Sequence, residues 1–302
     1  MAIRMTNGIM QTQLMSNLNK NMNRLSNLQN QSSSGVRLTK PSDDPSGVAY
    51  ALRYRSDLSY NDQYQTNTNS ALSWMDMTDS TLGEAGDIVK RIKELAVQGS
   101  NGTNDATALG AIQKEMDQLK NQLIDIGNSK LNGKYIFNGE NFTNKPYDTS
   151  DPSFNASAVT TNASEVKYTI SSGVTIPVNI SGNDLFGPAG ASDNLFSIID
   201  NITAALGSNK PEDVSSQLTN IDSAAERISN ARSLNGARTN RIELMQSRLK
   251  NLELNLNSMQ SDVEDADMEQ VLIDATTAQT VYEASLSVGS KILSTSLIDF
   301  IR

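Results

Sequence analysis

Residues 242–263 read IELMQSRLKNLELNLNSMQSDV, and this stretch decides the fold. Its apolar residues recur at alternating steps of three and four: Ile242, Met245, Leu249, Leu252, Leu256, Met259 and Val263. That spacing keeps one apolar stripe on a helix for about three heptads, which is the pattern of a coiled-coil seam. The alternation extends upstream toward Pro211, which suits a first helical turn because it lacks an N–H. We predict one helix from Pro211 to about Val263 that needs partner helices.

Two earlier stretches with heptad spacing can supply those partners. One runs from Pro45 to about Gln98, the other passes through Leu109 and Ile126 and stops near Asn132, and Asn101-Gly102 turns the chain between them. They are expected to pair as an antiparallel hairpin and to pack on the long helix. The predicted bundle core consists of Leu109, Ile112, Met116, Leu119, Leu123, Ile242, Met245, Leu249, Leu252 and Leu256.

The two ends of the chain carry weaker apolar stripes. An N-terminal helix is expected over residues 9–31, ended by Gly35, and a last helix resumes at Val271 after an eight-residue step that breaks the heptads. Neither stripe can stabilise a helix alone, so both ends are expected to be mobile in the monomer and ordered by assembly. The predicted assembly interface consists of Leu14, Met15, Leu18, Met22, Leu25, Leu28, Val271, Ala278, Tyr282, Ile292, Leu297, Ile298 and Phe300.

The middle of the chain changes character. Residues 134–137, 166–170 and 174–180 are rich in β-branched and aromatic residues and predict short strands, separated by a polar loop over 141–164. The predicted fold class is mainly α, a long antiparallel helical bundle or coiled coil built from both ends of the chain, with a small β-rich insertion. The predicted division is residues 1–40 pairing with 264–302, a bundle of 41–135 plus 205–263, and an outer insertion of 136–204.

Composition excludes many functions. The 302 residues include no Cys and no His, which removes thiol and imidazole catalysis, Cys/His zinc sites and disulfides. A net charge of −9 argues against nucleic acid and anionic membranes as partners. The sequence has no run of 18 apolar residues and no apolar core near its start, so we expect neither a membrane span nor an ordinary secretory signal. We expect no catalytic, cofactor-binding or metal-binding residues.

Three motifs that look like ligand sites have plainer interpretations. Asp43 and Asp44 could be a paired-carboxylate site, but their place before Pro45 favours a helix cap. The acidic stretch 262–269 lacks the Asp-x-Asp-x-Asp-Gly calcium loop and is expected to be a solvated face. Residues 127–134 lack the glycine spacing and the Ser or Thr of a P-loop.

Several separated blocks resemble the flagellin superfamily of bacteria, and within it the hook–filament junction proteins. The resemblance covers about residues 1–139 and 211–302. Its blocks are Pro41-Ser42-Asp43-Asp44-Pro45, Ala51-Leu52-Arg53, Glu94-Leu95-Ala96-Val97-Gln98, Asn132-Gly133-Lys134-Tyr135-Ile136-Phe137 and Ser296-Leu297-Ile298-Asp299-Phe300.

The resemblance implies a structural role without catalysis. It implies a ring of subunits between hook-associated protein 1 and flagellin that buffers their mechanical mismatch, located outside the cell on the flagellum. It also implies type III export without a cleavable signal, and an export chaperone on about Asp262 to Arg302.

Two alternative functions stay open at this point, and a third is excluded. One is flagellin, the filament subunit itself, and another is a cytoplasmic coiled-coil scaffold with ordered, dimeric ends. A filament-borne metalloprotease would need His-Glu-x-x-His, which a chain without His cannot supply.

Overall fold

The computed structural model describes residues 7–102, 104–150 and 154–300, with side chains from Ile9 to Lys291 outside the same gaps. The helices are α1 (Asn7–Ser34), α2 (Pro45–Gly99), α3 (Ala106–Gly127), α4 (Gly182–Phe186), α5 (Leu195–Gly207), α6 (Pro211–Ser216), α7 (Leu218–Glu264) and α8 (Met268–Phe300). The strands are β1 (Lys130–Leu131), β2 (Lys134–Tyr135), β3 (Lys167–Ser171) and β4 (Val174–Pro177), and a short 3₁₀ turn covers Ala156–Ala158.

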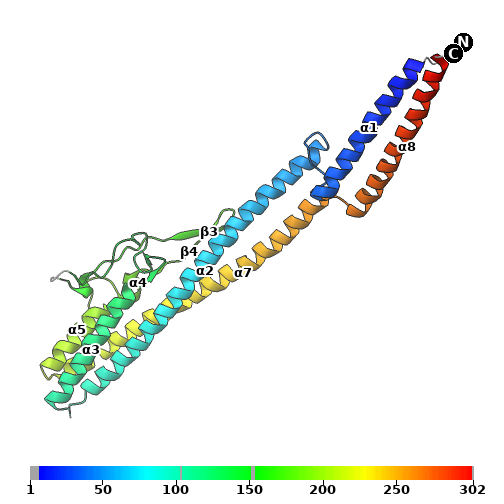
Figure 1. The fold of residues 1–302 in the computed structure, drawn as a ribbon. Helices are drawn as coiled ribbons and strands as arrows, with labels where there is room; N and C mark the ends of the chain where they lie inside the picture. The colour runs from blue at the N-terminus through cyan, green and yellow to red at the C-terminus, as the bar shows by residue number, and fades with distance from the viewer. Residues whose placement is uncertain (1–6, 103, 151–153, 301–302) are drawn as a thin grey trace. The chain divides into compact units, whose positions relative to one another are not determined.

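The chain divides into two compact units. Unit 1 comprises residues up to Tyr60 and from Glu253 onward, and unit 2 comprises Asn61–Leu252. In unit 1, α1 and α8 lie side by side and run antiparallel (Figure 1). In unit 2, α2 and α7 run antiparallel and α3 packs on α5 (Figure 1). Long antiparallel helices with two small hairpins confirm the predicted fold class.

One apolar core fills unit 2. It joins α2, α3, α5 and α7 to the inner faces of the hairpins, and the fully buried residues include Met75, Leu82, Met116 and Leu123. All ten predicted bundle-core residues are buried except Met245, which is half-buried, and Leu252. Leu252 is 44% exposed, so its predicted burial is wrong. Leu249 and Leu256 are buried, whereas Leu252 lies about 60° round the helix from Leu249, at the edge of the covered face.

Buried asparagines join α2 to α7 at two levels. The side-chain amide of Asn235 donates to the Met75 carbonyl at 3.0 Å, and that of Asn61 donates to the Leu249 carbonyl at 3.2 Å. Both side chains are almost fully buried. A donor that must meet one particular carbonyl fixes the register of two helices, as buried asparagines do in coiled coils.

Replacing Asn235 with Asp is expected to lower the free energy of unfolding by about 3 kcal/mol at neutral pH. The change removes the amide donor to the Met75 carbonyl and places a carboxylate at a site that is only 2% exposed. Urea unfolding should show the loss at pH 7 and a partial recovery at pH 4, where the carboxyl takes up a proton. Asn235→Leu is the control, and it should stay within about 1 kcal/mol of the parent because it removes both polar atoms.

A buried aromatic cluster lies at the C-terminal end of α3. Tyr147, Phe186 and Phe196 lie with ring centroids 5.1–5.8 Å apart. A Cβ added at Gly127 would lie 2.6 Å from the Tyr147 ring. The Asn128 side chain donates to the Tyr147 carbonyl and accepts from its N–H. These contacts end α3 at Gly127, five residues before the predicted end near Asn132.

Burial raises the pKa of the Tyr147 phenol above its ordinary value of 10. The folded chain therefore holds this phenol neutral at pH values where the unfolded chain ionises it. The stability that this gives is complete below about pH 10 and falls as the pH rises above it. Tyr147→Phe should weaken that alkaline loss, measured as the urea midpoint between pH 8 and 11, whereas Tyr60→Phe at an exposed position should leave it unchanged.

Two other predicted elements need correction. The helix predicted from Pro211 to Val263 is interrupted at Gln217, whose N–H binds the Val214 carbonyl three residues back and so closes α6 with a tight turn. The predicted strand 134–137 is shorter, because Ile136 and Phe137 leave β2 and enter the core. Asn132 and Gly133, with φ of 50° and 79°, form the two-residue turn that closes β1 on β2.

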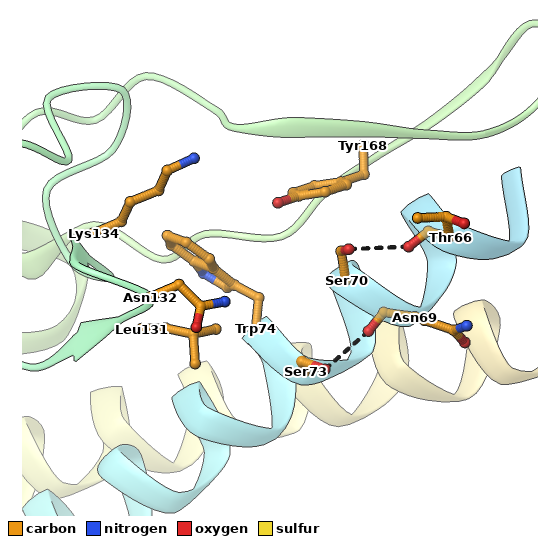
Figure 2. Close-up of a pocket in the computed structure, with 9 residues that line it drawn as sticks. All are labelled: Thr66, Asn69, Ser70, Ser73, Trp74, Leu131, Asn132, Lys134 and Tyr168. Carbon is orange, nitrogen blue, oxygen red and sulfur yellow. Dashed lines mark hydrogen bonds between the residues drawn. The ribbon is translucent and has the colours of Figure 1, made fainter. Parts of the chain in front are cut away.

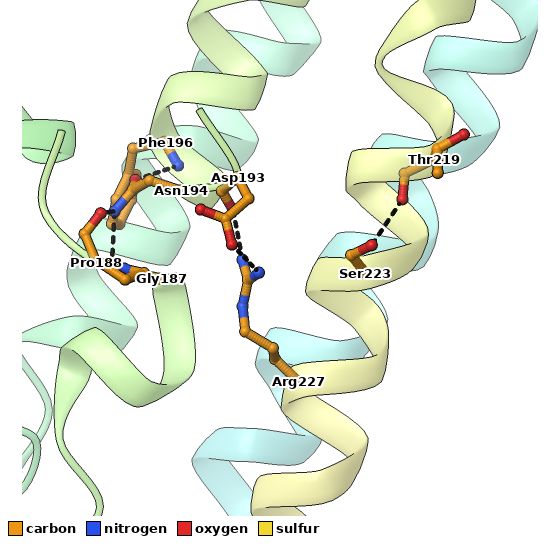
Figure 3. A network of polar contacts seen from close by, with 8 residues as sticks. All are labelled: Gly187, Pro188, Asp193, Asn194, Phe196, Thr219, Ser223 and Arg227. Atoms are coloured by element: carbon orange, nitrogen blue, oxygen red, sulfur yellow. Dashed lines mark hydrogen bonds and ion pairs between the residues drawn. The ribbon is translucent and has the colours of Figure 1, made fainter. Parts of the chain in front are cut away.

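The loop from α4 to α5 is bound to α7 through Asp193. The sequence did not predict this contact. Arg227 of α7 forms an ion pair with Asp193 at 3.0 Å (Figure 3). The next residue, Asn194, caps α5 by accepting from the Phe196 N–H and donates to the Gly187 carbonyl (Figure 3). This network holds the start of α5 in place.

Candidate assembly surface

The turn between α1 and α2 is built by the predicted cap. Oδ1 of Asp44 accepts from the backbone N–H of Ser46 and of Gly47 at 3.1 and 3.0 Å, with Pro45 at the first helical position. The Gly47 N–H, followed by the Ser46 hydroxyl, lowers the pKa of Asp44 below its usual value. Asp44 is therefore a helix cap, as predicted, and Asp43 closes the preceding bend by accepting from the Lys40 N–H.

This turn is bonded to the turn between α7 and α8. The Arg37 N–H donates to the Glu264 carbonyl at 2.7 Å, and the Ala266 N–H donates to the Gly35 carbonyl at 2.9 Å. The α1–α2 turn and the α7–α8 turn therefore each provide hydrogen-bond partners for backbone groups of the other that have no partner within their own turn. Gly35, with φ of 71°, ends α1 as predicted.

The acidic stretch 262–269 has structural roles. The carboxylate of Glu264 is buried and binds Arg55 at 2.8 Å and Gln260 at 2.7 Å. Asp267 caps α8 by accepting from two backbone N–H groups. Within the described residues, no group of three or more acidic side chains is arranged to hold a metal ion. The predicted solvated face is therefore wrong at Glu264.

Beyond the turns, α1 and α8 meet through a seam to which α8 contributes small residues such as Ser285 and Gly289. A Cβ added at Gly289 would lie 2.9 Å from the Leu14 side chain, so the two backbones approach closely there. Nearby, the Asn21 amide donates to the Ser285 hydroxyl at 3.2 Å. Small residues permit close packing but bury little apolar area, and the leucines opposite them on α1 are only half-buried, so the seam is thin.

The predicted interface residues fall into three groups in the structure. Leu14, Leu18, Leu25, Leu28 and Tyr282 are half-buried, and Val271 and Ala278 are buried, within the chain itself. Met15 and Met22 are exposed. Ile292, Leu297, Ile298 and Phe300 belong to α8, but their side chains lie outside the described residues. Val271 and Ala278 are covered by their own chain, and their part in contacts between subunits stays a prediction.

Other apolar residues of α8 remain uncovered beside the seam. At about 100° per residue, Leu272 and Leu286 lie on one side of the seam of α8, and Val281 and Val288 on the other. All four are exposed, as are Met15 and Met22 beside the seam of α1. We name these six residues the lateral patch. Heptad periodicity did not identify the α8 members of the lateral patch, because they lie between the heptad positions. Four apolar residues outside the heptad stripe could nevertheless have indicated a second apolar surface on this helix.

Burial is unevenly distributed between the units. Of the described exposed large apolar residues, all but Val97, Leu234, Leu244 and Leu252 belong to unit 1. The largest fully buried side chains all belong to unit 2. Exposed apolar area concentrated on one part of a chain marks a surface that interacts with other molecules. Across the described residues, no helix combines the length and hydropathy needed to cross a membrane.

The fold thus defines a helical subunit whose two chain ends form one unit with apolar residues left on its surface. Two family models match it, the bacterial flagellin N-terminal helical region over residues 6–142 and the bacterial flagellin C-terminal helical region over residues 218–301. The chain belongs to the bacterial flagellin family and is a structural subunit of the flagellum.

Individual relatives agree with this assignment. A flagellin of Halalkalibacterium halodurans is 26% identical over 269 residues, covering 89% of this chain and 88% of that protein. A flagellin of Clostridium tyrobutyricum is 28% identical over 220 residues, covering 72% of this chain but only 58% of that protein.

Two solved structures share the fold. A flagellar hook-associated protein from Vibrio parahaemolyticus has a TM-score of 0.67 at 20% identity and covers 74% of this chain and 100% of its own. The flagellar junction protein FlgL from Legionella pneumophila has a TM-score of 0.58 at 15% identity and covers 72% of this chain and 100% of its own.

Proposed function

We propose that this chain is hook-associated protein 3, the subunit of the ring that joins the flagellar hook to the filament. The ring contacts hook-associated protein 1 on one side and flagellin on the other. The observation that carries the proposal is the lateral patch, which leaves apolar side chains for neighbouring subunits on both sides of the α1–α8 seam. Fold likeness to hook-associated and junction proteins over their whole length favours the junction over other flagellar positions.

The chemistry of the patch suits a joint between unlike structures. Met15 and Met22 are unbranched and adapt to irregular surfaces, so their contacts tolerate small shifts between neighbours. A ring that adapts in this way buffers the mechanical mismatch between hook and filament.

Assembly after export explains why the ends are incompletely buried. The subunit travels unfolded through the type III apparatus, with an export chaperone on about residues 262–302, and completes its apolar burial beside its neighbours.

Location tests the proposal directly. In cells that express the chain with a small epitope inserted in the exposed turn at Gly173, antibody labelling is expected as a single band beside the hook. Deletion of the gene should leave hooks without filaments and release flagellin into the medium. Labelling along the whole filament would contradict the junction role and would instead support flagellin, the filament subunit.

That second candidate is flagellin itself. It is favoured by the similarity to a flagellin over nearly the full length of both chains. Purified chain added to filament seeds distinguishes the two, since flagellin elongates the seeds and a junction subunit does not.

Brief proteolysis of the purified monomer is expected to remove about 30 residues from the start and about 40 from the end of the chain. The thin α1–α8 seam opens readily, whereas the core of unit 2 protects its backbone. Mass spectrometry of the resistant fragment gives the cleavage points. Protection of both ends in the lone monomer would contradict ordering by assembly.

A further inference from the structure

A hollow of about 350 Å³ lies in unit 2 on the surface of α2. Trp74, Ser70 and Ser73 of α2 form one side, Asn132 and Lys134 of the β1–β2 hairpin another, and Tyr168 of β3 the third (Figure 2). Its volume is at the lower end of the range of about 300–1,000 Å³ for small-ligand sites. None of these residues takes part in the assembly surface.

The walls of the hollow are held in place without a ligand. The Asn67 side chain of α2 donates to the Thr169 carbonyl of β3 at 2.8 Å, which fixes the strand that carries Tyr168. Ser70 and Ser73 donate their protons to backbone carbonyls one turn earlier, at 3.0 Å each (Figure 2). Their oxygens therefore remain as acceptors facing the hollow.

One positive charge faces these neutral groups. The ammonium of Lys134 lies 4.7 Å from the centre of the Phe142 ring, and none of the ion pairs among the described residues includes it. A ring face holds a cation in position without neutralising its charge. The hollow has no carboxylate among its lining residues. Figure 2 shows the Lys134 side chain extending over the hollow, with the Tyr168 ring across from it.

Trp74 forms an apolar wall of the hollow. The indole is almost wholly buried, and its N–H is enclosed by protein, so this donor does not face the hollow. Trp74 therefore offers a bound molecule an apolar contact and no hydrogen bond.

We propose that this hollow binds a short saccharide that carries a carboxylate, such as a uronic acid. The sugar hydroxyls match the Ser70, Ser73 and Asn132 groups, the apolar face of the ring packs on Tyr168, and the carboxylate pairs with Lys134. A large apolar ligand is disfavoured because hydroxyl and amide groups form much of the lining.

Trp74 is the one tryptophan of the chain, so its fluorescence reports on the site directly. Titration of the full chain with digalacturonate is expected to change the emission saturably, and galactobiose, the uncharged counterpart, should bind about tenfold more weakly. Lys134→Gln should weaken digalacturonate binding by about tenfold and leave galactobiose binding unchanged. Tyr168→Ala should weaken the binding of both sugars.

Lys130→Gln is the matched control. Lys130 lies on the same hairpin with its ammonium 4.3 Å from the Tyr135 ring, but it does not line the hollow. Binding of digalacturonate should survive this change. No saturable change with either sugar, or equal losses in Lys134→Gln and Lys130→Gln, would overturn the proposal.

Discussion

Lysine at both Val281 and Val288 is expected to abolish swimming while leaving the fold of the monomer unchanged. The two side chains are 45% and 53% exposed on the same side of α8, so the lone chain accommodates the longer side chains in water. In an assembly that covers this side, each subunit would bury two unpaired ammonium groups, which costs several kcal/mol per charge. A ring repeats that cost at every contact, so the expected result is complete loss rather than a graded defect.

The measurement combines swimming in soft agar, electron microscopy of flagella and circular dichroism of the purified variant. The matched control places the same two charges at Thr280 and Ser287, which face away from the seam. Swimming should persist in that control. Loss of swimming in the control, with filaments retained in the Val281 and Val288 variant, would remove the lateral patch from the assembly surface.

Helix periodicity predicted most of the fold because each long helix buries one regular stripe. Leu109, Met116 and Leu123 recur at seven-residue intervals, and all three are buried. The helix cap in the turn 41–45 was also predicted correctly, because Asp is a preferred capping residue and Pro is a preferred first residue of a helix. Division of the chain into three parts by composition stays a prediction.

The sequence did not reveal features that depend on pairing between distant residues. The end of α3 depends on Tyr147, whose ring lies against Gly127, and no local pattern announces that contact. Glu264 was predicted to be solvated, but it is buried beside Arg55, which lies more than two hundred positions earlier in the chain.

For the assembly surface, the sequence located the helices but did not distinguish contacts within the chain from contacts between chains. The regular stripe of α8 contains Val271 and Ala278, which the chain covers itself. The irregular apolar residues beside it are those left exposed. A heptad pattern indicates that a face is covered, but it does not say whether the partner belongs to the same molecule.

Phe196→Ala is expected to lower the free energy of unfolding by about 3–5 kcal/mol, the usual cost of removing a fully buried aromatic ring. Phe196 is fully buried, with the Phe186 and Tyr147 ring centroids 5.1 and 5.4 Å away, so truncation leaves a cavity that its neighbours cannot easily fill. Leu18→Ala, at a half-buried site on α1, should cost only about 1 kcal/mol because little apolar area is lost there.

Urea unfolding followed by Trp74 fluorescence, which reports on unit 2, should show a large fall of the midpoint for Phe196→Ala and none for Leu18→Ala. Assembly should show the reverse order, since Phe196→Ala leaves the lateral patch intact and Leu18→Ala loosens the seam beside it. Equal stability losses in the two variants would mean that the chain ends are as firmly packed as the core. The free monomer would then have no incomplete surface for its neighbours to cover, and the physical basis of ordering by assembly would be gone.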